Sequence, residues 1–276
     1  MKIEIKDLRF TYPTGLEALQ GINLAINLGE QVAIVGQNGA GKTTLVRHFN
    51  GLLKPTSGSV SIGDWETTKH SVAKLASRIG YVFQNPENQL FALTVEKDIA
   101  FGPENLGLSR EEIRRRVDWA MRITNTETLK NLAPYELSGG QQQRAALAGV
   151  LAMGPSVIVL DEPTSFLDPR TAEGVMLAVE GLRREEGITV VVVEHRLDLV
   201  ARFADRMVVM DGGRVVADGV LRDVLDQESD RLTGLGVGIP RVSLLWNLLR
   251  RDSLVSGPVP TQVEEAAEHL SQRLRK

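Results

Sequence analysis

A glycine-rich segment near the start of the chain has the composition of a phosphate-binding loop. Residues 36–43 read GQNGAGKT and fit the pattern G-x-x-x-x-G-K-[ST]. The apolar run QVAIV precedes them and the helix-like run TTLVRHF follows, which is the context that makes the pattern specific. Glycines let the backbone fold around a phosphate with several N–H groups pointing inward. The residues predicted to bind a nucleotide here are Gly36, Gln37, Asn38, Gly39, Ala40, Gly41, Lys42, Thr43 and Thr44.

Two side chains of this loop have types suited to phosphoryl chemistry. Lys42 is expected to reach the β- and γ-phosphates of the nucleotide, and we count it among the catalytic residues. The hydroxyl of Thr43 is expected to ligate Mg²⁺. A chance glycine turn before a helix is the alternative interpretation, and the flanking strand and helix disfavour it.

Two adjacent carboxylates follow a second apolar strand. Residues 157–160 read VIVL and lead directly into Asp161 and Glu162. Ligands bind at the carboxyl ends of strands in open α/β sheets, so both side chains are placed for chemistry. We expect Asp161 to hold the magnesium shell and Glu162 to act as the general base that polarises the attacking water. The alternative is an acidic strand-to-loop turn without a function.

The composition excludes several classes of protein. The 276 residues carry 32 Lys+Arg against 35 Asp+Glu, and 42% are hydrophobic, which excludes global disorder. The absence of cysteine excludes a disulfide scaffold and cysteine-ligated metal sites. A net charge of −3 argues against a nucleic-acid partner. The longest uncharged apolar-rich stretch, Ala145–Leu160, is shorter than the roughly 18–20 residues of a membrane span, so membrane contact is expected only through partners.

The pattern of apolar residues predicts an α/β core with a helical insert. Residues 3–8 and 18–28 alternate as strands do, and residues 207–218 indicate a hairpin. Near-continuous β-branched runs at 157–160 and 188–193 favour a buried parallel sheet. Residues 87–150 are typical of helices, and Ser109 with Glu112 predicts a capping box at the start of one of them. A glycine-rich joint at 234–240 then leads into two amphipathic helices.

One further motif resembles the signature of a known family. The run Leu137-Ser138-Gly139-Gly140-Gln141 matches the signature sequence of ATP-binding cassette (ABC) ATPases, and it lies between the phosphate loop and the acidic strand as in that family. The resemblance covers roughly residues 2–230. It implies a P-loop NTPase fold with a RecA-like parallel-sheet core, an antiparallel β subdomain and a helical subdomain at about 87–150. It divides the chain into an ATPase domain, 1–230, and a helical dimerisation appendage, 231–276.

The resemblance also implies the reaction and the roles of single residues. The substrate is ATP with Mg²⁺, and two cassettes pair head to tail so that the signature of one, Ser138 to Gln141, covers the γ-phosphate bound by the other. Tyr12 matches the aromatic residue that stacks on adenine. Gln84 matches the loop glutamine that senses magnesium, the attacking water and the transport partner, and His195 matches the switch histidine that contacts the γ-phosphate. Residues 165–168 match the loop that crosses the dimer interface.

Three positions depart mildly from the family pattern. Gln37 replaces the commoner proline, Phe166 is bulky for its loop, and His195 stands between Glu194 and Arg196 rather than in Thr-His-Asp. None of them removes a side chain that the family needs for hydrolysis.

Residues 83–105 and the C-terminal tail are similar to those of energy-coupling-factor (ECF) transporter ATPases. The segment FQNPENQLF with Gln89, followed by TVEKDIAFGPEN, carries this likeness. It implies uptake of a vitamin or of cobalt or nickel ions, on the cytoplasmic face of the cell membrane. The implied partners are a second ATPase subunit, identical or paralogous, an integral membrane coupling subunit and a small substrate-binding membrane subunit. Another importer branch, a soluble ABC ATPase outside transport, and a regulatory module without turnover are the alternatives.

Overall fold

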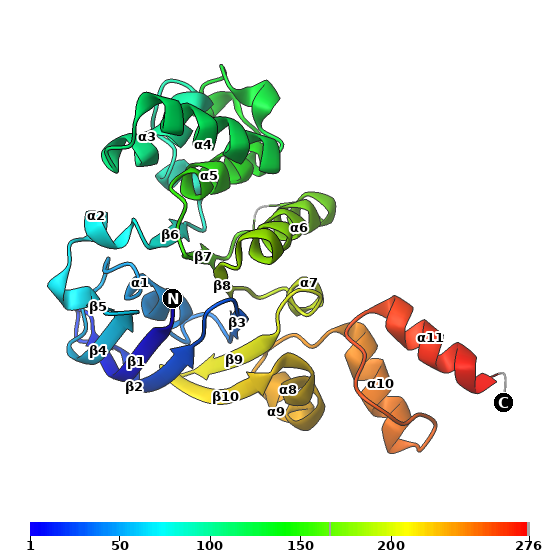
Figure 1. Cartoon of the computed structure of the whole chain (residues 1–276). Helices are drawn as coiled ribbons and strands as arrows, with labels where there is room; N and C mark the ends of the chain where they lie inside the picture. The colour runs from blue at the N-terminus through cyan, green and yellow to red at the C-terminus, as the bar shows by residue number, and fades with distance from the viewer. Residues whose placement is uncertain (166, 275–276) are drawn as a thin grey trace.

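The apolar runs form a six-stranded sheet at the centre of the molecule. The structure is a computed structural model that describes residues 1–165 and 167–274 (Figure 1), so Phe166 of the predicted crossing loop lies outside the described residues. The strand order is β10-β9-β3-β8-β7-β6, and every pairing is parallel except β9 with β10. The strands are β3 (Gln31–Val35), β6 (Ile79–Val82), β7 (Val157–Asp161), β8 (Thr189–Val193), β9 (Arg206–Asp211) and β10 (Arg214–Val220). The predicted parallel sheet and the predicted hairpin are both confirmed.

A second, antiparallel sheet lies against this core. Its strands, in the order β2-β1-β4-β5, are β1 (Ile3–Thr11), β2 (Glu17–Ile26), β4 (Ser57–Ile62) and β5 (Trp65–Glu66). The helix α1 (Lys42–Arg47) begins directly after the phosphate loop. Leu45 and Val46 of α1 share one buried cluster with apolar side chains of both sheets. The phosphate loop is therefore anchored between two rigid layers.

A group of helices projects from the far edge of the large sheet (Figure 1). It contains α3 (Val95–Asn105), α4 (Arg110–Ile123) and α5 (Gly139–Ala152), which pack on one another. The predicted capping box at Ser109 is only half formed. Ser109 Oγ accepts from the N–H of Glu112, but the Glu112 carboxylate binds Arg115 and Arg116 instead of reaching back. Three charge-assisted bonds on the helix surface, two from Arg115 and one from Arg116, outcompete one bond to a backbone N–H.

The remaining helices cover the sheet and extend the chain beyond it. Helix α6 (Pro169–Glu186) joins β7 to β8, and a glycine in the left-handed conformation, Gly187, ends it. Three short helices follow, and the two predicted C-terminal helices, α10 and α11, are present around a small core of Trp246, Val255 and Val259. No helix among the described residues is long and apolar enough to cross a membrane. The bounds are α2 (Val72–Leu75), α7 (Leu197–Val200), α8 (Leu221–Gln227), α9 (Ser229–Gly234), α10 (Arg241–Arg251) and α11 (Val263–Leu274).

Candidate functional site

Four neighbouring strands of the large sheet deliver the predicted site residues to one edge. The phosphate loop follows β3, His195 follows β8, Glu162 follows β7 and Gln84 follows β6. Because these strands are parallel, their carboxyl ends meet at the same edge of the sheet. Residues that are far apart in the sequence thereby form one cluster.

Close packing dictates the glycines at both ends of the phosphate loop. Gly36 and Gly41 have φ values of 151° and 97°. A Cβ at Gly36 would clash with the carbonyl of Met210 on β9, and one at Gly41 would lie 2.7 Å from the carbonyl oxygen of Ala18 on β2. Strands from both sheets therefore hold the loop, and only glycine fits at either end.

Lys42 places a positive charge inside this loop. Its side chain folds back so that Nζ donates to the carbonyl oxygens of Gly36 and Gln37, each at 2.9 Å. An ammonium group has three donors, so one donor remains for a ligand. Burial lowers the pKa of the Lys42 ammonium below its usual value, and the carboxylates of Glu162 and Asp161 act in the opposite direction. The loop thus combines a cation with converging backbone groups, as binding of a phosphate requires.

Asp161 connects the phosphate loop to the strand β6. One carboxylate oxygen, Oδ1, accepts from the Thr43 hydroxyl at 2.8 Å, and the other accepts from the Tyr81 hydroxyl at 2.7 Å. The Asp161 carboxylate is almost completely buried, at 2% exposed. Burial and the adjacent carboxylate raise the pKa of Tyr81 well above its usual value, so its hydroxyl stays protonated and donates. Sequence reasoning missed Tyr81, whose only signal is one polar atom in an apolar strand.

Glu162 is the centre of a second cluster next to the first. Its carboxylate accepts from Gln84 Nε2 at 2.6 Å, from His195 Nε2 at 2.7 Å and from Ser165 Oγ at 3.0 Å. The backbone at Glu162 has φ of +49°, an uncommon conformation for a side-chain-bearing residue that costs of order 1 kcal/mol or more. The structure therefore brings together Glu162, Gln84 and His195, which lie far apart in the sequence.

Tyr12 lies against the first turn of the helix α1. Its hydroxyl is 2.9 Å from Thr44 Oγ1, and the edge of its ring meets Phe10 with centroids 4.8 Å apart. These two contacts fix the orientation of the Tyr12 ring beside the phosphate loop. Its predicted role, stacking on adenine, stays a prediction.

The signature segment belongs to a different part of the molecule from the phosphate loop. Ser138 and Gln141 cap the start of α5 reciprocally, with Ser138 N to Gln141 Oε1 at 2.8 Å and Gln141 N to Ser138 Oγ at 3.4 Å. Helix α5 packs in the helical group, whereas α1 packs on β2 and β7 (Figure 1). The structure does not join these two segments within one chain, and Ser138 and Gly139 are exposed.

Comparisons with known proteins identify the family. The ABC transporter family matches residues 19–165 of the chain. The energy-coupling factor transporter ATP-binding protein EcfA of Methanococcus maripaludis is 41% identical over 276 residues, which cover 99% of this chain and 98% of that protein. EcfA1 of Caldanaerobacter subterraneus is 42% identical over 274 residues, covering 97% of this chain and 98% of that protein. The chain belongs to the ABC transporter ATPase family. Within that family, it is an ATPase of the ECF type.

Solved structures of ABC ATPases agree with this assignment. CbiO1 of Clostridium perfringens, part of the ABC transporter complex cbiONQ, matches with a TM-score of 0.75 and 40% identity over 88% of this chain and 97% of CbiO1. The dimeric cassette MJ0796 in a post-hydrolysis state with ADP and phosphate matches with a TM-score of 0.72 and 36% identity, over 80% of this chain and 99% of that one. The chain has the α/β fold of the P-loop NTPases, and it is an ATP-binding, ATP-hydrolysing subunit.

The residues beside the phosphate loop suit a divalent cation. Mg²⁺ prefers oxygen ligands and is held by one or two carboxylates together with substrate phosphates. Thr43 and Asp161 supply a hydroxyl and a carboxylate that already touch each other. Gln84 donates from its amide nitrogen to Glu162, so its amide oxygen is available as a further metal ligand. This donor set fits Mg²⁺.

Two departures of this ATPase from the family pattern have a structural consequence. The buried carboxylate of Glu194 accepts from the hydroxyl of Thr164 and from the N–H groups of His195 and Arg196, the latter two at 2.9 and 3.2 Å. It therefore ties the loop that carries His195 to the loop that follows Glu162. Sequence reasoning treated Glu194 only as a departure.

The amide of Gln37 lies close to Gly236, which places the phosphate loop beside the joint of the C-terminal appendage.

Proposed function

We propose that this ATPase powers the import of a vitamin or a transition-metal ion by an ECF-type transporter. In this proposal, two cassettes bind two ATP molecules between them, and membrane partners carry the cargo. The observation that supports turnover best is the Glu162 carboxylate, held by Gln84, Ser165 and His195 directly after the strand that carries Asp161. The names of the relatives support the ECF branch.

The side chains of the site divide the work of hydrolysis. Glu162 accepts a proton from the attacking water and orients it, while His195 holds the water and the γ-phosphate. Lys42 stabilises the charge on the phosphoryl group bound by its own subunit. The backbone amides of Ser138 and Gly140 in the opposite subunit stabilise the same charge. Thr43, Asp161 and Gln84 would hold Mg²⁺, which when bound neutralises phosphoryl oxygens. Tyr12 stacks on the adenine.

The separation of the signature from the phosphate loop supports a head-to-tail dimer. Each ATP then touches the loop of one subunit and Ser138 to Gln141 of the other, so ATP favours the closed dimer. Hydrolysis removes the bridging phosphate, and the dimer then reopens. Ser165, Leu167 and Asp168 would face the partner in this arrangement. The second subunit is a copy of this chain or a paralogue.

An apolar groove beside Gln84 is suited to a helix of the membrane coupling subunit. The groove, of about 270 Å³, lies between the core and the helical group. Phe91 and Leu52 at its rim are 65% and 42% exposed, and the rings of Phe91 and Phe101 pack edge to face. The Gln89 side chain links the core to the helical group. Its amide oxygen accepts from the N–H of Phe83, and its amide nitrogen donates to the Ala146 carbonyl on α5. Motion of the helical group would thus reach a docked helix.

The C-terminal appendage, residues 231–276, contributes to the pairing of cassettes in this proposal. Helix α10 exposes Leu244, Leu245 and Leu248 to solvent. The appendage would keep two subunits together when ATP is absent. The assembly would lie on the cytoplasmic face of the cell membrane, held there by the coupling subunit and a small substrate-binding membrane subunit.

Purification of the tagged chain from gently solubilised native membranes tests this function. The proposal predicts two stoichiometric membrane partners, a coupling subunit and a small hydrophobic protein that identifies the cargo. Recovery of a conventional permease would move the chain to another importer branch. Recovery without any membrane protein would contradict transport and would leave a soluble ABC ATPase.

A further inference from the structure

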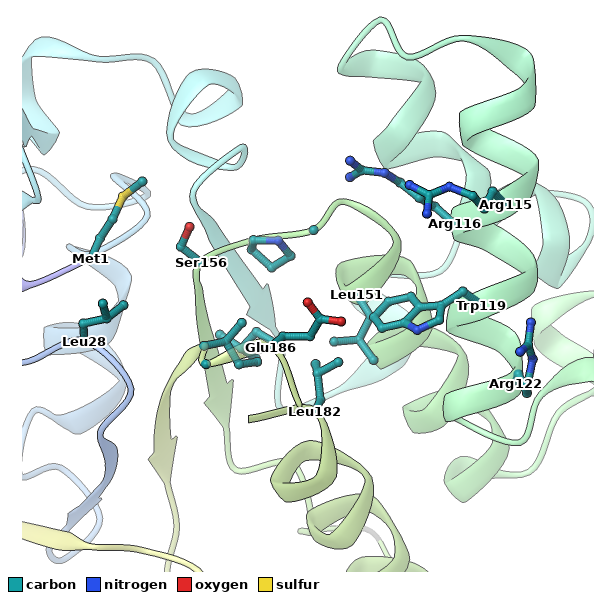
Figure 2. A pocket seen from close by; sticks show the side chains of 15 residues that line it. Met1, Leu28, Arg115, Arg116, Trp119, Arg122, Leu151, Ser156, Leu182 and Glu186 are labelled. Carbon is teal, nitrogen blue, oxygen red and sulfur yellow. The ribbon is translucent and has the colours of Figure 1, made fainter. Parts of the chain in front are cut away.

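A large cavity lies at the opposite edge of the sheet from the nucleotide site. It has a volume of about 680 Å³, within the range of roughly 300–1,000 Å³ typical of ligand pockets. Ser156 lines it where β7 begins, whereas Asp161 and Glu162 lie where β7 ends. The wall on one side is α4 of the helical group, and the other wall comes from the core, with Met1, Leu28 and the end of α6 (Figure 2). The cavity therefore bridges two parts of the molecule.

The floor of this cavity consists of aliphatic side chains, and one aromatic ring stands on its wall. Leu151, Ile158, Leu182 and Ile188 line it with aliphatic side chains that are otherwise buried in the core. The indole of Trp119 points from α4 toward Leu151 and remains partly exposed (Figure 2). A flat body of a small molecule would bury apolar area mainly against the partly exposed ring of Trp119, above a floor of aliphatic residues that are already buried.

The wall formed by α4 carries a surplus of positive charge. Arg115 and Arg116 share a single carboxylate, Glu112, at 2.8 and 2.6 Å, and Arg116 also donates to the Met153 carbonyl at 2.9 Å. The backbone carbonyl of Arg122 accepts from Asn125 N–H, but within the described part of the chain its guanidinium has no hydrogen-bond or ion-pair partner. Glu186 is likewise without a described partner, and it lines the opposite wall (Figure 2). Arg115, Arg116 and Arg122 thus line the cavity, and Glu186 is the carboxylate among its lining residues.

We propose that this cavity binds a small amphiphilic anion, with an aromatic or apolar body and one anionic group. The anionic group would lie at Arg122, because a guanidinium group forms strong charge-assisted bonds with sulfonate, phosphate or carboxylate oxygens. The body would lie on Trp119 and the aliphatic floor. Glu186 disfavours a second anionic group at the far end through like-charge repulsion. The ligand class is therefore an anion with its charge at one end.

Occupancy of the cavity would slow ATP turnover without blocking the binding of ATP. The ligand would touch α4 on one side and α6 and β7 on the other, so it would restrict movement of the helical group against the core. This consequence rests on the proposed function, in which the helical group presents Ser138 to Gln141 to the partner's nucleotide. We expect a lower kcat at an unchanged KM for ATP.

Titration of the full-length protein with two matched dyes tests the site. Anilinonaphthalene sulfonate has the proposed chemistry, and N-phenylnaphthylamine has the same rings without the sulfonate. We expect one saturable sulfonate site whose Kd rises about tenfold in Arg122→Gln and falls in Glu186→Gln. Arg114→Gln is the matched control, because Arg114 is on the same helix, is 87% exposed and does not line the cavity. The uncharged dye is expected to bind at least tenfold more weakly than the sulfonate.

Several results would overturn this inference. Equal sulfonate affinity in Arg122→Gln and Arg114→Gln would do so, as would loss of dye binding in Phe91→Ser, which changes the separate apolar groove. Competition between the dye and ATP would place the dye in the nucleotide site. Dye binding is measured without ATP, so its outcome is independent of whether the chain functions in import. If the sulfonate dye bound as expected but left kcat for ATP unchanged, the binding site would stand and only its effect on ATP turnover would be refuted.

Discussion

At the scale of single residues, the site consists of two carboxylates with different surroundings. Asp161 is buried and bound by two hydroxyl groups, from Thr43 and Tyr81. Glu162, its neighbour in the sequence, is held by an amide, an imidazole and a hydroxyl at the surface of the site. The first environment suits a metal ligand of fixed orientation, and the second suits a base that handles a proton. In the proposed mechanism, these adjacent residues thus serve different parts of one reaction.

Tyr81→Phe tests the positioning of Asp161. The substitution removes one hydroxyl and leaves Asp161 Oδ2 without its donor, so the carboxylate is oriented less firmly. Loss of such an outer contact typically weakens metal affinity by tenfold or more. We expect the Mg²⁺ concentration for half-maximal ATPase activity to rise roughly tenfold, while ATP binding measured without Mg²⁺ stays unchanged. Tyr135→Phe, at a tyrosine that is 86% exposed, is the control. An unchanged Mg²⁺ requirement would show that Tyr81 only fills the core.

At the scale of elements, strands and loops explain how these residues meet. Four parallel strands end at one edge, and the loops that follow them carry the phosphate loop, His195, Glu162 and Gln84. The short helix α1 is anchored by His48 at its end. The His48 ring is completely buried, contacts Phe10 edge-on and has Nδ1 2.7 Å from the Thr44 carbonyl. Burial lowers the pKa of His48 below its usual value.

The buried histidine predicts a dependence of stability on pH. The folded state disfavours protonation of His48, whereas the unfolded chain takes up the proton near pH 6.5. Its contribution to stability is therefore present above pH 6.5 and is lost as the pH falls through that value toward the lowered pKa. The free energy of unfolding, measured with urea between pH 5.5 and 8, should fall as the pH is lowered below 6.5. We expect His48→Gln to reduce the slope of this free energy against pH by up to about 1.4 kcal/mol per pH unit. An identical slope in the variant would contradict this assignment.

The sequence predicted the elements and motifs well because their signals are local. Continuous β-branched runs such as residues 188–193 can be recognised without a structure, and the phosphate loop is one contiguous pattern. Contacts between distant segments have no such signal. The bond from Tyr81 to Asp161 and the bonds that Glu194 makes to both loops depend on strand order and register. The Ser109 capping box was predicted from spacing, but competing arginines three and four residues beyond Glu112 take its carboxylate.

At the scale of the whole molecule, two exposed features of the described residues bear on how the chain assembles. The signature segment is exposed at the start of α5 in the helical group, and α10 exposes Leu244, Leu245 and Leu248. Both features are accounted for if the working unit contains two cassettes. The apolar groove at Phe91 extends the same reasoning to a membrane subunit. A single chain therefore holds the parts of a site that pairing would complete.

Leu245→Glu tests the role of the appendage in pairing. Leu245 is 52% exposed on α10, and a charge there would oppose burial against a second subunit. We expect the dissociation constant of the nucleotide-free dimer to rise at least tenfold in sedimentation experiments. Leu177→Glu, at a leucine with 53% exposure on α6, should leave it unchanged. If the two variants formed dimers with equal dissociation constants, the appendage would not be part of the interface.

The most direct test of the central claim is phosphate release by Glu162→Gln together with the size of the ATP-bound protein. Glutamine keeps the shape of the side chain but cannot accept the proton. The account predicts that turnover falls by at least about a hundredfold, that ATP affinity is kept, and that ATP with Mg²⁺ traps a stable dimer. Glu185→Gln, an exposed position on α6, should behave like the unaltered protein. Hydrolysis by Glu162→Gln at the unaltered rate, without a trapped dimer, would contradict the account.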